Sequence, residues 1–221
     1  MFGSYVFDAY GTLFDVHAAI ARHRAAAGPE AERLSEIWRT KQLEYTWTLT
    51  LAGRYVDFWA LTERALDFAL ARVPSVDRAL RGRLLDAYLT LDAFPDVGAT
   101  LADLKAKGAR LAILSNGSPR MLAAAVEAAG IGSMLDAVLS VEAVRRYKPR
   151  PEVYALVTDT LAVRAADIAF VSSNRWDVMG AVSFGLSAFW INRSRVPDEY
   201  EDFSPLREIQ NLAALPKMEQ Q

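Results

Sequence analysis

Short apolar segments recur along the chain, and each ends at polar or turn-forming residues. This pattern predicts β-strands at Ser4–Phe7, Arg110–Leu114, Ala137–Ser140, Ile168–Val171 and Ser187–Ile191. The intervening stretches have helical periodicity and are bounded by helix-ending glycines or first-turn prolines. The predicted helices are Val97–Lys107, a helix from Pro119 that reaches Gly130, Glu152–Leu161 and Trp176–Phe184. Strands that alternate with helices at this spacing indicate βαβ units and a parallel sheet.

The segment between Val16 and Leu91 has a different pattern and separates the first strand from the rest. It is rich in Ala, Leu, Arg and Glu, and it contains no convincing strand. Breaks at Gly28-Pro29, Gly53 and Pro74-Ser75 predict three or four helices. Its apolar content is too periodic for a loop, so we expect an inserted helical cap.

The expected fold class is α/β, with a Rossmann-like parallel-sheet core and an inserted helical cap. We expect a core domain of residues 1–14 and 92–221 and a cap domain of residues 15–91. The polar tail after Arg193 is expected to form a surface helix.

Composition excludes several classes of function. The chain has 221 residues with 25 basic and 27 acidic side chains, and its net charge of −2 argues against a basic nucleic-acid binder. The absence of cysteine removes disulfides, thiolate zinc sites and cysteine nucleophiles. The only histidines are His17 and His23, which we expect on the cap surface. Nucleophilic chemistry would therefore use a carboxylate or a hydroxyl.

The N-terminal segment does not resemble a secretory signal, because it lacks a basic region and its apolar run stops at Asp8. No uncharged apolar stretch reaches the roughly 18 residues that a membrane span requires. We expect a cytoplasmic protein that binds neither nucleic acid nor a membrane.

Polar residues cluster where the predicted strands end. The clusters are Asp8, Ser115-Asn116, Lys148 shortly after the third strand, and Ser172-Ser173-Asn174 with Asp177. The carboxyl ends of parallel strands form the ligand crevice of an open sheet. One such cluster is ordinary turn chemistry, whereas four that include opposite charges predict an active site.

These clusters resemble the four ordered motifs of the haloacid dehalogenase superfamily. The motifs are Phe7-Asp8-Ala9-Tyr10-Gly11-Thr12, Leu114-Ser115-Asn116-Gly117, Lys148-Pro149, and Val171-Ser172-Ser173-Asn174 with Asp177. The resemblance spans nearly the whole chain. It does not by itself give the reaction, because most members of the superfamily resemble phosphatases.

Two departures from the phosphatase pattern favour a dehalogenase. Phosphatases of the superfamily usually carry a second Asp where this chain has Tyr10. They also carry acidic residues after the last core strand, where this chain has Ser172-Ser173-Asn174 and so lacks the charged oxygen ligands that magnesium prefers. Both departures resemble the (S)-2-haloacid dehalogenase branch, which works without a metal.

The insertion also resembles the cap of that branch. The matching segments are Trp38-Arg39-Thr40-Lys41-Gln42-Leu43-Glu44-Tyr45-Thr46-Trp47 and Gly53-Arg54-Tyr55. Thr40 stands where relatives often have Gln, and we expect it to alter the pocket wall rather than the chemistry.

The resemblance implies hydrolysis of short-chain (S)-2-haloalkanoic acids to (R)-2-hydroxy acids and halide, without a cofactor. Asp8 would displace the halide and form an ester, which water then hydrolyses at the Asp8 carbonyl. The resemblance also implies a homodimer formed through the cap helices.

Cationic side chains would offset the repulsion between the Asp8 carboxylate and the substrate carboxylate. Two like charges about 4 Å apart cost on the order of 4 kcal/mol at an effective dielectric of 20, so Asp8 needs cations to approach a carboxylate substrate. Lys148, held by Asp177, and Arg39 on the halide side would supply them. Neither cation is expected in the packed core.

The other expected site residues are polar groups and apolar walls. Ser115 would bind the substrate carboxylate and Asn116 the halide, Thr12 would hold Asp8, and Tyr154 would steady Lys148 or Asp177. Ser172 and Asn174, with Asp177, would position Asp8, Lys148 and the hydrolytic water. The expected apolar walls are Tyr10, Leu43, Phe58 and Trp176.

Two alternatives stay open from the sequence. The first is a small-metabolite phosphatase of the same superfamily, for which Tyr10 supplies no acid/base carboxylate. The second is a non-catalytic dimerising member, in which Asp8 and Arg39 would be dispensable.

Overall fold

The computed structural model describes residues 2–218 and contains a six-stranded sheet. Its strands are β1 Ser4–Phe7, β2 Arg110–Ser115, β3 Ala137–Ser140, β4 Ile168–Ser172, β5 Ser187–Ile191 and β6 Arg207–Ile209. Their order is β3-β2-β1-β4-β5-β6, and each neighbouring pair is parallel. The first five strands confirm the sequence-based prediction, as does the α/β class with a helical insertion.

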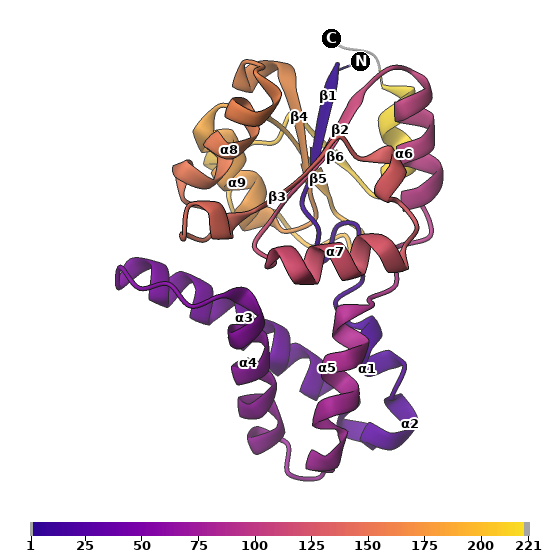
Figure 1. Cartoon of the computed structure of the whole chain (residues 1–221), viewed down its shortest axis with the longest axis vertical. Helices are drawn as coiled ribbons and strands as arrows, with labels where there is room; N and C mark the ends of the chain where they lie inside the picture. Colours follow the sequence, from indigo (N-terminus) through magenta and orange to yellow (C-terminus); the bar gives the residue numbers. More distant parts are fainter. Residues whose placement is uncertain (1, 219–221) are drawn as a thin grey trace.

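Helices cover both faces of the sheet, which explains why its inner strands are continuous apolar runs. All residues of β1 and β4 are buried. α8 (Pro151–Leu161) and α9 (Arg175–Phe184) lie on one side, and α6 (Val97–Ala106) lies on the other (Figure 1). α7 (Pro119–Ala128) lies between the sheet and the inserted helices. The carboxyl ends of the parallel strands point toward those helices.

The insertion between β1 and α6 forms five α-helical segments within the described part of the chain. They are α1 Ala18–Ala21, α2 Arg24–Ala27, α3 Ala31–Leu51, α4 Phe58–Arg72 and α5 Arg81–Leu89. The predicted breaks fall between α2 and α3, after α3, and between α4 and α5. The prediction of three or four helices is too low because α1 and α2 are single turns, too short to show a helical period.

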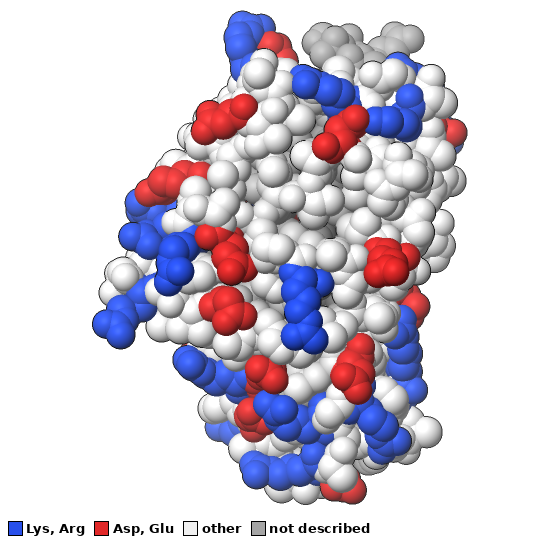
Figure 2. All heavy atoms as spheres, viewed as in Figure 1, with Lys and Arg blue, Asp and Glu red and all other residues white. Residues whose placement is uncertain are grey.

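Charged side chains of both signs are interspersed on the face shown in Figure 2. No large area of one sign appears on that face, in agreement with the net charge of −2. Across residues 2–218, no helix combines the length and apolar character needed to cross a membrane.

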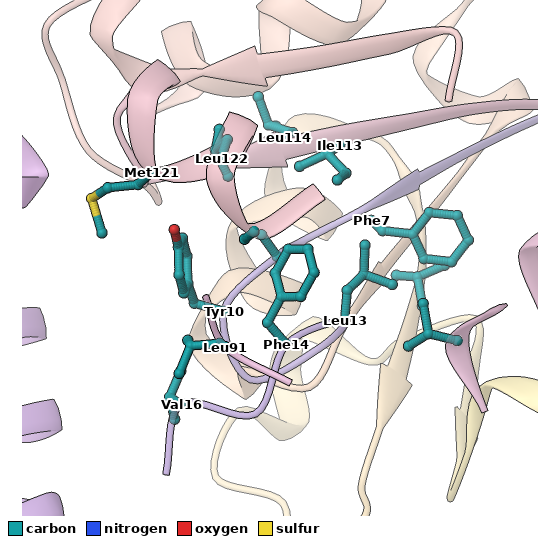
Figure 3. Packing of buried hydrophobic residues seen from close by; sticks show 14 of the residues in the cluster. Phe7, Tyr10, Leu13, Phe14, Val16, Leu91, Ile113, Leu114, Met121 and Leu122 are labelled. Carbon is teal, nitrogen blue, oxygen red and sulfur yellow. The ribbon is translucent and has the colours of Figure 1, made fainter. Parts of the chain in front are cut away.

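The chain passes between the sheet and the insertion twice, and the two passages pair with each other. The Asp15 N–H donates to the Asp92 carbonyl at 2.9 Å, and the Phe94 N–H donates to the Leu13 carbonyl at 2.9 Å. Figure 3 shows the apolar side chains that pack at this junction, among them Tyr10, Phe14 and Leu91. The loop after β1 is therefore fixed to the returning passage of the chain by hydrogen bonds at Leu13 and Asp15.

The expectation of a surface helix after Arg193 is wrong. Residues Arg207–Ile209 form β6 beside β5, and the Asn192 N–H donates to the Ile209 carbonyl at 2.7 Å. The following 3₁₀ turns, Leu212–Lys217, pack against α6 and bury Leu212. A strand of 3 residues with two exposed side chains has no alternating pattern to detect, so only its long-range pairing reveals it.

Candidate active site

Three charged side chains from distant parts of the chain meet at the carboxyl edge of the sheet. Asp8 follows β1, Lys148 precedes α8, and Asp177 lies in the first turn of α9. The Lys148 Nζ donates to Asp8 Oδ1 at 3.1 Å and to Asp177 Oδ2 at 2.8 Å. The exposed fractions of Asp8, Lys148 and Asp177 are 5%, 1% and 0%. These three charged side chains are thus almost completely excluded from solvent.

The expectation that Lys148 lies outside the packed core is wrong. An ammonium can be buried when opposite charges and hydrogen bonds replace its water, and two carboxylates do so here. Burial lowers the pKa of Lys148, but Asp177 and Asp8 more than offset that effect and the net shift is upward. Lys148 is therefore a cation at neutral pH.

Burial acts in the opposite direction on Asp177. It raises the pKa of Asp177 to about 6, with Lys148 lowering the pKa and Asp8 raising it. The Tyr154 hydroxyl donates to Asp177 Oδ1 at 2.7 Å, and burial raises the pKa of Tyr154, so this phenol keeps its proton. A Cβ at Gly180 would clash with the Tyr154 hydroxyl, which explains the glycine there. Tyr154 thus steadies Asp177 rather than Lys148.

The second oxygen of the Asp8 carboxylate has its own donors. The Asn174 Nδ2 donates to Asp8 Oδ2 at 2.8 Å, and the Thr12 hydroxyl donates to the same oxygen at 3.2 Å. The Ser172 hydroxyl accepts from the Asn174 N–H at 3.1 Å, so Ser172 acts on the loop rather than directly on Asp8. The orientation of the carboxylate is therefore fixed by residues after β1 and β4.

Ser173 also shapes this loop, although sequence reasoning gave it no role. Its N–H donates to Thr12 Oγ1 at 2.9 Å, and its hydroxyl donates to the Gly11 carbonyl at 2.7 Å. These contacts join the first motif to the last. Its place between Ser172 and Asn174 in the motif was the available signal.

The loop after β2 completes the carboxyl edge of the sheet. The Ser115 hydroxyl accepts from the Gly117 N–H at 3.0 Å, and Asn116 Oδ1 accepts from the Lys148 N–H at 3.1 Å. A Cβ at Gly117 would lie 2.6 Å from Tyr10 Cε2, so only glycine lets the loop approach this ring. The hydrogen bond from the Lys148 N–H to Asn116 joins the second motif to the third.

Arg39 reaches the site from α3 in the insertion and is half-buried. Its Nη2 donates to the Tyr10 carbonyl at 3.2 Å and to Asn174 Oδ1 at 3.4 Å. Its Nη1 donates to Gln42 Oε1 at 2.8 Å. The Asn174 side chain thus bridges Arg39 and Asp8. The insertion thereby supplies the second cation of the site.

A hollow of about 420 Å³ opens beside Arg39. Its other lining residues are Gly11, Asp15, Val16, His17, Leu43, Phe94, Ser173, Asn174, Ile191, Asn192, Arg193, Ser194 and Val196. A larger hollow of about 630 Å³ beside β3 and α7 contains none of the predicted site residues, so size alone does not locate the site.

Three of the four predicted apolar walls, Tyr10, Phe58 and Trp176, belong to two aromatic groups. Tyr10 stacks on Tyr88 with ring centroids 5.8 Å apart and lies 5.9 Å from Phe58. Trp176 meets Trp47 edge-to-face with centroids 5.4 Å apart. Leu43 lines the hollow with Arg39, as its position one turn further along α3 predicts.

Thr40 does not reach the pocket wall, contrary to expectation. It is exposed and lines a separate surface hollow with Glu36 and Phe68. Adjacent helix residues point about 100° apart, so Thr40 turns away from Arg39. Gln42, 3 positions after Arg39, shares its face instead.

The structure thus brings most of the predicted polar residues into one hydrogen-bonded network. Its members are Asp8, Thr12, Arg39, Asn116, Lys148, Tyr154, Ser172, Asn174 and Asp177. Ser115 stands at the end of β2 next to this network, and the histidines lie outside it.

A model of haloacid dehalogenase-like hydrolases matches residues 4–185, and the chain belongs to this family. The chain is 49% identical over 215 residues to (S)-2-haloacid dehalogenase 1 of Pseudomonas sp. strain CBS-3, covering 96% of this chain and 94% of that protein.

Two solved structures extend the comparison. A crystal structure of a dehalogenase has a TM-score of 0.96 and 44% identity, covering 100% of this chain and 98% of that one. The L-2-haloacid dehalogenase of Xanthobacter autotrophicus, solved with chloropropionic acid covalently bound, has a TM-score of 0.87 and 37% identity, with 98% of each chain covered. These findings confirm the resemblance to the (S)-2-haloacid dehalogenase branch.

Proposed function

We propose that this protein hydrolyses short-chain (S)-2-haloalkanoic acids to (R)-2-hydroxy acids through an ester on Asp8. The observation that carries the proposal is the buried Asp8 carboxylate, which Lys148 and Asn174 hold by its two oxygens at 3.1 Å and 2.8 Å. Arg39 supplies a second cation from the insertion. The full-length similarity to (S)-2-haloacid dehalogenase 1 supports the same reaction.

In the first step Asp8 attacks the halogen-bearing carbon from the side opposite the halogen. A carbon–oxygen bond forms, the carbon–halogen bond breaks, and the configuration at carbon inverts. The carbon–halogen electron pair leaves with the halide, which Arg39 stabilises. Two cations offset the repulsion between the Asp8 and substrate carboxylates.

Ser115 and Asn116 are suited to hold the substrate during this step. The Ser115 oxygen already accepts from the Gly117 N–H, so its own O–H can donate to the substrate carboxylate. The Asn116 oxygen accepts from the Lys148 backbone, which directs the amide NH₂ elsewhere. We assign that NH₂ to the halide side.

In the second step water attacks the Asp8 carboxyl carbon and the ester is cleaved. Donors from Lys148 and Asn174 already contact the Asp8 oxygens, so a charge-stabilising group is in place for the developing oxyanion. Net hydrolysis releases the hydroxy acid, one halide ion and one proton, and it restores Asp8.

The residues present fit a divalent cation poorly, which disfavours the phosphatase alternative. The ammonium of Lys148 lies between Asp8 and Asp177 and contacts both carboxylates. Ser172-Ser173-Asn174 offers only hydroxyl and amide groups where hard cations prefer carboxylates. Tyr10 stacks on Tyr88 and packs at a tilt against Phe58, and its phenol cannot replace an acid/base carboxylate.

The direct test is halide release from the separate enantiomers of 2-chloropropionate, with and without a chelator. We expect chloride from the (S) enantiomer alone and the same rate in chelator. If the chelator abolishes activity and magnesium restores it, the result would favour the phosphatase alternative. No halide release from either enantiomer would contradict the proposal.

We also propose a homodimer formed through the cap helices, a cytoplasmic location, and a core of residues 1–14 and 92–221 with a cap of residues 15–91. The dimer is supported by Leu51, an exposed apolar side chain at the end of α3. The domain boundary is supported by the backbone hydrogen bonds Leu13–Phe94 and Asp15–Asp92, which join the two passages of the chain. Light scattering of the purified protein tests the dimer, and cell fractionation tests the location.

A further inference from the structure

Gln42 lies one helical turn after Arg39 and is only 1% exposed. Its Oε1 accepts from Arg39 Nη1 at 2.8 Å and from the Tyr88 hydroxyl at 3.1 Å. Its Nε2 donates to Thr62 Oγ1 at 2.7 Å. Gln42 therefore joins the halide-side cation to two other helices of the insertion.

The hydrogen-bond chemistry fixes which end of the Gln42 amide faces Arg39. The Thr62 hydroxyl donates to the Phe58 carbonyl at 2.7 Å, so its oxygen is left to accept. Only the NH₂ end of Gln42 can donate to that oxygen. The carbonyl end then faces Arg39 and Tyr88, both of which are donors.

The far end of this chain of contacts is anchored in packed structure. Thr62 is 0% exposed, and its backbone carbonyl accepts from Trp38 Nε1 at 2.9 Å. Trp38 in turn lies against Tyr88 with ring centroids 5.0 Å apart. The acceptor offered to Arg39 is thus held by α3, α4 and α5 together, and its position is fixed before substrate binds.

We propose that Gln42 is a positioning residue that aims the Arg39 guanidinium at the leaving halide, and that Thr62 holds Gln42 in the required orientation. This inference rests on the proposed dehalogenase function. A neutral amide suits the role, because it orients the guanidinium through a hydrogen bond without cancelling the positive charge that the halide needs. A carboxylate at position 42 would pair with Arg39 and remove that charge from the site.

The test compares Thr62→Val, which removes the hydroxyl at nearly constant volume, with Thr62→Ser, which keeps it. Single-turnover displacement of chloride and of bromide from (S)-2-halopropionates is measured with enzyme in excess, together with the thermal unfolding midpoint. We expect Thr62→Val to slow chloride displacement by about tenfold or more, the scale of one misplaced charged hydrogen bond. The rate of bromide displacement should fall less, because bromide is the better leaving group. Thr62→Ser should displace both halides at the wild-type rates.

Two further variants keep the inference testable if Thr62→Val does not fold. Tyr88→Phe removes the other donor to Gln42 Oε1 and should change the chloride-to-bromide ratio in the same direction. Gln42→Glu should change the ratio more strongly, because it neutralises Arg39. Equal losses for both halides, or no loss in any variant, would overturn the role of Gln42. A wild-type protein that releases no halide would instead overturn the proposed function.

Discussion

The Lys148 Nζ lies 3.1 Å from Asp8 Oδ1, although the two residues are 140 positions apart in the chain. The contact exists because β1 and the loop before α8 end at the same edge of the sheet. It places a permanent positive charge against the proposed nucleophile in a nearly dry site, where charge interactions are strong.

Lys148→Ala should reduce halide release at least about a hundredfold, the scale of losing one charge-stabilising donor. It should also lower the unfolding free energy by about 3–5 kcal/mol, because two buried carboxylates lose their shared partner. Steady-state halide release and denaturant unfolding measure the two effects. A stable, fully active variant would contradict both roles of Lys148.

Arg39→Ala should lower turnover by at least about a hundredfold for the same electrostatic reason. The unfolding midpoint should change little, because Arg39 is half-buried and its partners keep other hydrogen bonds. Arg33→Ala on the same helix is the matched control, since within residues 2–218 the ion pair of Arg33 is an exposed one with Glu30, a kind of contact that contributes little. Near wild-type turnover of Arg39→Ala would remove Arg39 from the mechanism.

The position of water attack has an isotopic signature. In a single turnover in ¹⁸O-water with enzyme in excess, the label should enter the Asp8 side chain, and the product hydroxyl should carry unlabelled oxygen from Asp8. Mass analysis of the peptide that contains Asp8 locates the label. Label in the product and none in that peptide would mean that water attacked the substrate directly and that no ester forms.

The raised pKa of Asp177, about 6, predicts a pH dependence of stability. An unfolded aspartate titrates near pH 3.9, so between these values the folded protein binds more protons at this group than the unfolded chain does. The contribution of Asp177 to the unfolding free energy is therefore present at low pH and is lost as the pH rises through about 6. Denaturant unfolding from pH 4 to pH 7 should show this decline.

Asp177→Asn removes the titrating group while keeping a side chain of the same shape. The share of the pH slope that Asp177 causes should then disappear, whatever the absolute stability of the variant. An unchanged slope would show that the pKa of Asp177 is not raised in the folded protein.

Much of the fold was accessible from the sequence because its signals are local. Buried strands such as Ile168–Ser172 are continuous apolar runs, and helices such as α7 begin with a proline and end near a glycine. The order of strands and helices then restricts the topology to a parallel sheet, whose carboxyl edge collects the residues that follow each strand. Asp8, Lys148 and Asn174 could be named in advance for that reason.

The pattern of residues alone thus predicts the order of the elements, the helical insertion and the chemical types gathered at the sheet edge. Three features emerge only once the chain is folded: Arg207–Ile209 joins the sheet, Lys148 is buried, and Gln42 bonds to Thr62 and Tyr88 on other helices. These features depend on backbone pairing and side-chain contacts between segments far apart in the chain. Such contacts leave no periodic pattern in either segment alone, so they become visible only when both segments are in place.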